Sequence, residues 1–301
     1  MPQGLAHKFK EIIAAYYWAA YLLHHALRLR PGKPLKNSRL VVVGSFRAGG
    51  AGKTPFCLWL AKELLKNGKT VTVLCHKYAL DEGKMYRQAL DGAIRQGMAE
   101  VVITGNRYKT AIALDHHNPP DVILCDDGFE DSRLRPDLIF RLDWEKAPTE
   151  IRQLIPAGRF RSLRQDHLKD EPRTVPVKCF GPTPDAIFRI GSIANADGCH
   201  PQFEQSIAVC GIGDPERFFK DLEKEEYPLQ EKFIYPDHDK NFSLKLENIL
   251  RKHPRTNVII TEKDSFRLSR QLLENPQVYV ARQAVTITKG FLKTSHFRVH
   301  Q

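Results

Sequence analysis

GSFRAGGAGKTP, residues 44–55, is the stretch that decides the fold. It follows an apolar run at 39–44 (RLVVVG) and precedes an apolar-periodic run at 53–67, so it joins a predicted buried strand to a predicted helix. Backbone N–H groups of such a glycine-rich turn can surround phosphate oxygens, and the N-terminus of the next helix favours anions. The stretch therefore predicts a phosphate-binding loop at the edge of an α/β sheet.

The groups that would contact a nucleoside triphosphate lie in the second half of this stretch. Lys53 would reach the terminal phosphates, and the Thr54 hydroxyl would bind Mg²⁺. The longer form of the pattern needs glycine at position 47, which is Arg47 here, so the match is the shorter form G-G-x-G-K-T. A glycine-rich turn that binds no ligand is the alternative, and it leaves the presence of both Lys53 and Thr54 without a reason. The residues assigned to the nucleotide here are Gly49, Gly50, Ala51, Gly52, Lys53 and Thr54.

A second apolar strand ends in two acidic residues. The run at 122–125 (VILC) is followed directly by Asp126 and Asp127. In phosphate-loop proteins an acidic residue at such a strand end helps to hold Mg²⁺, directly or through water. The sequence therefore predicts a magnesium site formed by Thr54, Asp126 and Asp127.

Apolar strands alternate with helical stretches along most of the chain. In the first part, strands are predicted at 39–44, 70–75, 101–104, 122–125 and 138–142, and helices at 53–67, 85–98 and 108–116. Strands that are apolar on both faces predict an α/β fold, in which a mostly parallel sheet carries helices on both faces, as in P-loop NTPases.

A second alternating segment predicts a smaller C-terminal α/β domain. Its strands are predicted at 207–210, 258–261 and 278–281, and its helices at 215–224 and 265–273. The charged, aperiodic stretch at 145–173 predicts a substrate-facing loop region or a linker. The predicted domains are an N-terminal helix at 1–34, a P-loop domain at 35–175 and the smaller domain at 176–301.

Composition narrows the classes of partner. The six cysteines form no C-x-x-C pair, which indicates reduced thiols and neither a disulfide framework nor a zinc site. The net charge of +11 fits a nucleic acid, an anionic membrane or a phosphorylated substrate. Because the cations are interspersed with acids and no nucleic-acid-reading motif is present, we do not expect a nucleic-acid partner.

The N-terminal stretch at 12–27 (IIAAYYWAAYLLHHAL) is almost entirely apolar or aromatic. It is shorter than the roughly 20 residues needed to cross a bilayer, and no small-residue cleavage site follows it. Aromatic rings flanked by cations suit a helix that lies in the membrane interface. The alternative is a helix that packs on the domain. The flanking cations are Lys8, Lys10, Arg28 and Arg30.

Together these and further motifs resemble one family, the tetraacyldisaccharide 4'-kinases. The motifs that carry the resemblance are, in chain order, GSFRAGGAGKTP (44–55), CHKYA (75–79), LDE (80–82), DDGFED (126–131), IPAG (155–158), GIGDPERFF (211–219), PDHD (236–239) and TEKD (261–264). Their order and approximate spacing hold from about residue 40 to residue 268. The resemblance implies a kinase that transfers the γ-phosphate of ATP, with Mg²⁺, to the 4'-hydroxyl of a lipid A disaccharide 1-phosphate precursor. It also implies a glycolipid acceptor and a peripheral location on the anionic cytoplasmic face of the inner membrane, and it implies no oligomeric state.

The resemblance also implies roles for individual residues. Asp81 would accept the proton of the acceptor hydroxyl, His238 would orient Asp81 or tune its charge, and Lys53 would complete the catalytic set. Lys263 and Asp264 would contact the nucleotide base or order the domain interface; a role in starting a helix is equally compatible.

Several positions depart from the family pattern. CHKYA replaces S-R-G-Y-G, a segment that normally precedes the acidic LDE motif is missing, and Ser162 takes the place of a carboxylate near the metal. Glu130 and Asp131 replace glutamine and histidine. Three functions stay open from the sequence: a divergent lipid A kinase, a P-loop kinase for another glycolipid or small molecule, and a non-catalytic, membrane-associated nucleotide-binding protein.

Overall fold

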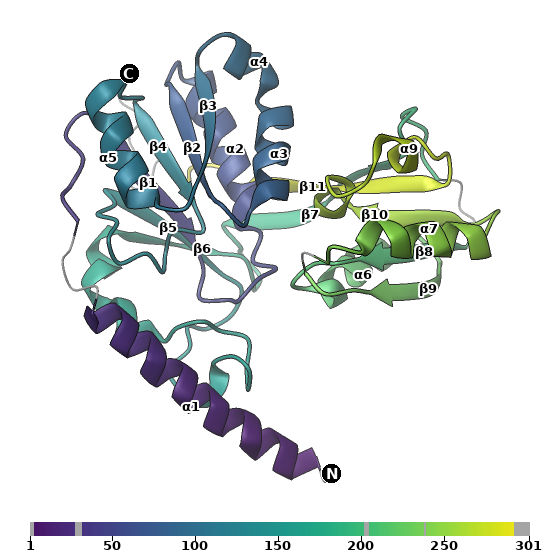
Figure 1. Ribbon diagram of the computed structural model, residues 1–301, viewed down its shortest axis with the longest axis horizontal. Coiled ribbons are helices and arrows are strands. Elements are labelled where there is room, and N and C mark those ends of the chain that lie inside the picture. The colour runs from purple at the N-terminus through teal and green to yellow at the C-terminus, as the bar shows by residue number, and fades with distance from the viewer. Residues whose placement is uncertain (1–2, 28–31, 202–204, 238, 292–301) are drawn as a thin grey trace. The chain divides into compact units, whose positions relative to one another are not determined.

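The computed structural model describes residues 3–27, 32–201, 205–237 and 239–291 (Figure 1). The chain divides into two compact units. Unit 1 comprises Met1–Ile187 and Ile287–Gln301, and unit 2 comprises Phe188–Thr286. The sequence placed the boundary at 175/176, whereas the compact units divide at 187/188 and again at 286/287, so the chain returns to unit 1 at its end.

Unit 1 is built on a six-stranded sheet with the order β3-β2-β4-β1-β5-β6. Every neighbouring pair is parallel, which confirms the predicted parallel sheet. The central strands β1 and β4 carry apolar runs that are buried on both faces, as in the VVV run of β1. The strands are β1 (Arg39–Gly44), β2 (Val71–His76), β3 (Ala99–Thr104), β4 (Val122–Asp126), β5 (Leu138–Asp143) and β6 (Thr174–Lys178).

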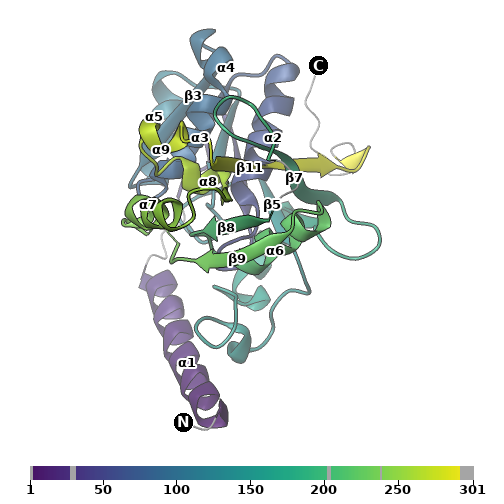
Figure 2. The ribbon, with the colours of Figure 1, turned by 90° about the vertical axis from the view of Figure 1, so that its right-hand side faces the viewer.

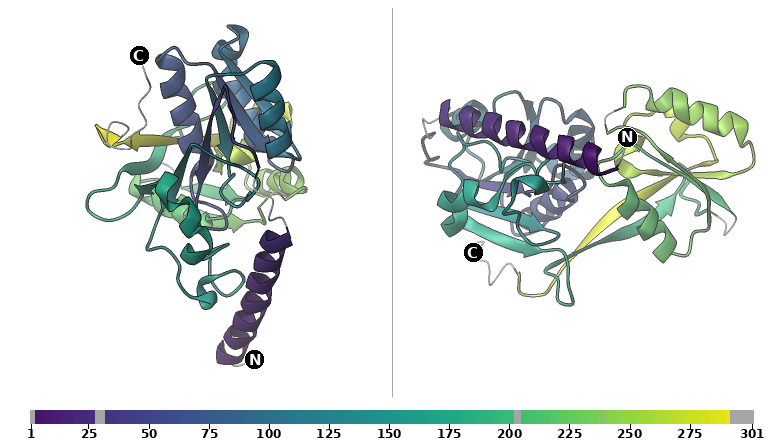
Figure 3. Two further views of the ribbon diagram at one scale, coloured as in Figure 1. Left: turned by 90° about the vertical axis from the view of Figure 1, so that its left-hand side faces the viewer. Right: turned by 90° about the horizontal axis from the view of Figure 1, so that it is seen from below.

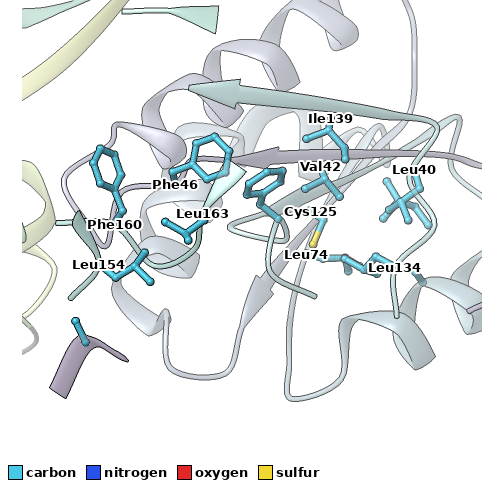
Figure 4. Close-up of a cluster of buried hydrophobic side chains, with 14 residues drawn as sticks. Leu40, Val42, Phe46, Leu74, Cys125, Leu134, Ile139, Leu154, Phe160 and Leu163 are labelled. Carbon is cyan, nitrogen blue, oxygen red and sulfur yellow. The ribbon is translucent and has the colours of Figure 1, made fainter. Parts of the chain in front are cut away.

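Helices cover both faces of this sheet, as the alternating pattern predicts. On one face Phe56 of α2 packs against Phe140 of β5. On the other face Ala111 of α5 joins a cluster that includes Leu40 and Val42 (Figure 4). Successive residues of β1 therefore serve opposite faces. The helices are α2 (Lys53–Lys66), α3 (Leu80–Ala89), α4 (Asp91–Arg95) and α5 (Arg107–His117).

The helix predicted at 85–98 has different bounds in the structure. α3 begins five residues earlier, at Leu80, and a second short helix, α4, ends at Arg95. Gly97, with φ at 72°, turns the chain out of α4 in the left-handed region that favours glycine, and β3 begins at Ala99.

Unit 2 contains a five-stranded sheet with the order β7-β11-β10-β8-β9 (Figure 2). α7 packs through Phe242 and Leu246 on one face, and α6 packs through Phe219 and Leu222 on the other. The strands are β7 (Ala186–Ala194), β8 (Ser206–Cys210), β9 (Leu229–Ile234), β10 (Asn257–Thr261) and β11 (Val278–Ile287). The helices are α6 (Pro215–Lys224), α7 (Phe242–Lys252), α8 (Glu262–Ser265) and α9 (Arg270–Leu273). The predicted helix at 215–224 matches α6, whereas the one predicted at 265–273 is divided between α8 and α9.

The N-terminal helix α1 (Gln3–Leu27) lies beside a short 3₁₀ helix of unit 1, η1 (Ile151–Gln153) (Figure 3). One of its faces is packed, with Ala14 fully buried and Tyr17 and Trp18 against the core cluster. Its other face is apolar but open, since Tyr16 is 74% exposed and Leu23 is 61% exposed. The helix therefore packs on the domain and also presents an exposed apolar stripe. In the part of the chain that the structure describes, no helix is sufficiently long and apolar to span a membrane.

Candidate functional site

The predicted phosphate loop connects β1 to α2. Gly49, Gly50 and Gly52 have φ values of 123°, 62° and 71°, a backbone conformation that side chains rarely tolerate. Gly52 is the N-cap of α2, and it has no side chain with which to cap the first amides of the helix. Those N–H groups and the helix dipole make this end of α2 suitable for an anion.

Close packing fixes where the loop begins. A Cβ added to Gly44, the last residue of β1, would lie 2.2 Å from the Cβ of Phe129. Phe129 belongs to the DDGF segment that follows β4. The glycine at 44 therefore lets the acidic segment approach the start of the phosphate loop.

Thr54 and Asp126 meet as the sequence predicted. The Thr54 hydroxyl donates a hydrogen bond of 2.8 Å to Oδ2 of Asp126, and the Tyr86 hydroxyl donates another of 2.8 Å to the same oxygen. Tyr86 is fully buried on α3, which brings that helix to the site. No motif singled out Tyr86, because a tyrosine in a helix is most often a core residue.

The other oxygen of Asp126, Oδ1, is buried and has no hydrogen-bond partner among the described residues. Burial, and then the nearby charge of Asp127, raises the pKa of Asp126 to about 6. Mg²⁺ prefers oxygen ligands, and this carboxylate oxygen receives no hydrogen bond from any residue that the structure describes and lies in the same site as the Thr54 hydroxyl. Thr54 and Asp126 therefore fit a magnesium ion.

Asp127 lies between two cations. Its Oδ1 is 3.3 Å from Nζ of Lys53, and its Oδ2 accepts a hydrogen bond of 2.9 Å from Nη1 of Arg161. Burial alone would raise the pKa of Asp127, but Lys53 and Arg161 hold it well below its usual range. Asp127 adopts φ at 55°, which is uncommon for a residue other than glycine. The site thus combines one protonatable carboxyl, Asp126, with one that stays ionised.

Arg161 is a site residue that sequence reasoning did not select. It lies in the 145–173 stretch, which the structure assigns to unit 1 and packs against the phosphate loop. The amide of Ala48 donates to the carbonyl of Arg159 at 2.9 Å, and the amide of Arg161 donates to the carbonyl of Phe46 at 2.8 Å. Its position three residues after the IPAG motif was an available signal.

Ser162, which takes the place of a carboxylate in the family pattern, is itself hydrogen-bonded to one. Its hydroxyl donates to Oε1 of Glu130 at 2.7 Å, and Tyr21 of α1 donates to Oε2 at 2.8 Å. His167 completes the cluster, with Nε2 at 2.9 Å from the Ser162 oxygen and its ring stacked on Phe129 at 4.1 Å. The partly buried carboxylate of Glu130 thus connects the N-terminal helix to the segment that carries Arg161.

The remaining predicted site residues lie in different places. Asp81 is in the first turn of α3, the helix that also carries Tyr86, and it is partly buried. His238 lies outside the described residues.

Lys263 and Asp264 belong to unit 2. Asp264 is fully buried and accepts hydrogen bonds from the Gly211 amide at 3.0 Å and from the Thr261 hydroxyl at 2.7 Å. Nη1 of Arg267 lies 3.0 Å from Oδ1 of Asp264, and Nζ of Lys263 lies 3.0 Å from Asp237. Asp264 thus joins Thr261, at the end of β10, to the GIGDP loop within unit 2.

Comparisons with known proteins agree with one another. A family model described as tetraacyldisaccharide-1-P 4'-kinase (LpxK) matches residues 11–296. The chain is 29% identical over 278 residues to the tetraacyldisaccharide 4'-kinase of Haemophilus influenzae, with 83% of this chain and 80% of the relative covered. It is 30% identical over 256 residues to that of Actinobacillus succinogenes, with 78% and 77% covered. Among solved structures, the fold is similar to the "apo" form of LpxK from Aquifex aeolicus in complex with ATP, with a TM-score of 0.65, 24% identity, and 96% of this chain and 98% of that chain covered.

Proposed function

The chain belongs to the tetraacyldisaccharide-1-P 4'-kinase family, and from this premise we propose that it transfers the γ-phosphate of ATP to the 4'-hydroxyl of a lipid A disaccharide 1-phosphate precursor. The observation that carries the proposal is the Thr54–Asp126 pair, with its partnerless carboxylate oxygen, beside Lys53. This arrangement supplies a cation site next to a phosphate loop. Phosphoryl transfer needs chiefly that combination of position and charge neutralisation.

In this proposal different groups of the chain bind the phosphates, neutralise their charge and hold the metal ion. The loop amides and the first turn of α2 bind the phosphates, and Lys53 neutralises charge on the transferred group. Thr54 and Asp126 would hold Mg²⁺, which supplies further charge neutralisation at the phosphate oxygens when bound. Asp127 keeps Lys53 and Arg161 at the site through the ion pairs described above.

Asp81 and His238 are proposed for the acceptor side. A sugar hydroxyl is a weak nucleophile, so a carboxylate that accepts its proton assists attack, commonly by about 10²- to 10⁴-fold. Asp81 lies on the same helix as Tyr86, which reaches the Thr54–Asp126 pair. His238 is proposed as its orienting partner from the family pattern, and Lys263 as a contact of the nucleotide base. For Asp264, the contacts within unit 2 support an ordering role.

The exposed stripe of α1 supports a peripheral membrane location. Phe9, Ile12, Tyr16, Leu23 and Leu27 recur at helical spacing and are each more than half exposed. An apolar helix face beside lysines binds the interface of an anionic bilayer. We therefore place the protein on the cytoplasmic face of the inner membrane, where a lipid-linked acceptor is accessible.

A flotation assay tests the membrane location. With vesicles of phosphatidylethanolamine and phosphatidylglycerol, serine at positions 12, 16 and 23 should reduce the bound fraction severalfold. The matched control places serine at Leu168, Ile187 and Leu244, which are 58%, 48% and 58% exposed elsewhere, and should bind as the unmodified chain does. Equal flotation of both triple variants would exclude α1 as the membrane contact.

The activity is tested by ATP consumption with and without tetraacyldisaccharide 1-phosphate. We expect acceptor-dependent turnover that falls by at least about 100-fold in Asp81→Asn. The control Asp91→Asn, an exposed residue of α4 paired with Arg95, should keep full activity. Turnover that ignores this lipid would favour another acceptor, and ATP binding without turnover for any acceptor would favour a non-catalytic protein.

A further inference from the structure

The segment that follows β5 contacts the phosphate loop from outside. The indole N–H of Trp144 donates a hydrogen bond of 2.9 Å to the carbonyl oxygen of Ala51. Ala51 lies between Gly50 and Gly52 and is 1% exposed. The bond is made across 93 residues of sequence, so it depends on the tertiary fold.

This contact determines the orientation of one peptide plane. The peptide that joins Ala51 to Gly52 is trans, so its carbonyl oxygen and its amide hydrogen point in opposite directions. With the Ala51 oxygen held by the indole, the Gly52 N–H must point away from Trp144. Rotation of this peptide changes ψ of Ala51 and φ of Gly52, and glycine tolerates a wide range of φ, so without an external partner the peptide would rotate at a lower steric cost.

The segment that carries Trp144 is itself attached to the phosphate loop. The Ser45 hydroxyl donates to the carbonyl of Leu142 at 2.7 Å, which ties the end of β5 to the first turn of the loop. On the other side of Trp144, a carboxylate oxygen of Glu145 lies 3.8 Å from Nε of Arg47. Trp144 therefore extends from a segment that is attached to the loop on both sides.

We propose that Trp144 is a positioning residue for nucleotide binding, and that its hydrogen bond to Ala51 aims the Gly52 N–H at the phosphates. This inference rests on the proposed function only in assigning a nucleoside triphosphate to the loop. Trp144 acts through the peptide plane and not by touching the substrate. Preorganising an amide donor lowers the conformational cost of binding, so removing the indole N–H weakens phosphate binding without changing the acceptor side.

The test removes the hydrogen bond in two ways. Trp144→Phe deletes the N–H along with part of the ring, and benzothienylalanine at position 144 replaces the N–H by sulfur while preserving the ring shape. Binding of ATP with Mg²⁺ is measured by isothermal titration calorimetry, which needs no acceptor. A net hydrogen bond corresponds to about three- to tenfold in affinity, so we expect that weakening in both variants. The control is Trp59→Phe, whose indole packs on Phe56 at 5.4 Å, and its affinity should stay within about twofold of the unmodified chain.

A kinetic readout separates positioning from a structural role. We expect the KM for ATP to rise by about three- to tenfold while the KM for the lipid acceptor stays unchanged. ATP binding by the benzothienylalanine protein equal to that of the unmodified chain would overturn the inference. An unmodified chain that binds ATP but phosphorylates no lipid would refute the proposed function and leave this test intact.

Discussion

Replacing Asp126 by asparagine should make the protein more stable and inactive at the same time. Burial raises the pKa of Asp126 from its ordinary 3.8 to about 6. Because one pKa unit corresponds to about 1.4 kcal/mol, the ionised carboxylate costs the fold about 3 kcal/mol above pH 6. The neutral amide removes that cost and still accepts the Thr54 and Tyr86 hydrogen bonds. Its NH₂ group would then stand at the partnerless Oδ1 position, which costs about 1–2 kcal/mol.

The net expectation is a gain of about 1–2 kcal/mol in the free energy of unfolding at pH 7.5 in EDTA. The sign of this difference in the free energy of unfolding depends on pH. Between about pH 4 and pH 6 the folded protein holds the Asp126 proton more tightly than the unfolded chain does, so this contribution to stability is lost as pH rises. The asparagine variant lacks that slope, whereas the cost of its unpaired NH₂ group does not depend on pH. The variant should therefore be less stable than the unmodified protein by about 1–2 kcal/mol near pH 4 and more stable by about 1–2 kcal/mol at pH 7.5.

Urea unfolding followed by tryptophan fluorescence measures this difference. The three tryptophans, at positions 18, 59 and 144, all belong to unit 1, which carries the site. Adding Mg²⁺ at pH 7.5 should stabilise the unmodified protein more than the variant, because only the former keeps the anionic ligand. A variant that is less stable than the unmodified protein by about 1 kcal/mol or more at pH 7.5 in EDTA, or a stability difference that does not change with pH, would show that burial does not raise the pKa of Asp126.

Three further substitutions have definite outcomes. Lys53→Ala should reduce phosphoryl transfer by at least about 100-fold with an unchanged far-UV circular dichroism spectrum; full turnover would contradict the role of the loop. Tyr21→Phe removes a hydrogen bond to the partly buried carboxylate of Glu130 and should lower the urea stability of unit 1 by about 1–3 kcal/mol. Tyr16→Phe on the exposed face of α1 should change it by less than about 0.5 kcal/mol. Asp264→Asn should lower the stability of unit 2 by about 3 kcal/mol in hydrogen exchange, and Asp237→Asn, which is more exposed, by less than about 1 kcal/mol; equal effects would mean that burial of the first carboxylate is not what matters.

Local sequence patterns were sufficient to predict the parallel sheet and the phosphate loop. The apolar runs at 39–44 and 122–125 correspond to β1 and β4, because strands buried on both faces show no polar alternation. The helix at 215–224 was also predicted with the observed bounds, since it begins at a proline that follows an aspartate N-cap.

Other elements carry weaker local signals. α7 was not predicted, although its Phe242, Leu246 and Ile249 form the core of unit 2. β9 alternates between partly buried and exposed residues and contains a lysine and a glutamate, which obscure its pattern. A short amphipathic element of this kind is determined by what it packs against, and a single sequence does not show that.

Only part of the site was predictable, because some of its residues belong to motifs and others do not. Thr54 and Asp126 follow recognisable motifs, and their contact follows from the neighbouring parallel strands β1 and β4. Tyr86, Arg161 and Trp144 reach the site from elements far away in sequence, so only the tertiary fold identifies them. The assignments of Asp81 and His238 stay predictions.

The position of the phosphate on the product tests the proposed 4'-kinase activity most directly. The protein is incubated with ATP, Mg²⁺ and tetraacyldisaccharide 1-phosphate, and the lipid is analysed by ³¹P NMR and mass spectrometry, with Lys53→Ala as the control. We expect a second phosphate at the 4'-position that forms with the unmodified protein and not with the variant. A lipid that is unchanged, or phosphorylated at another hydroxyl, would contradict it.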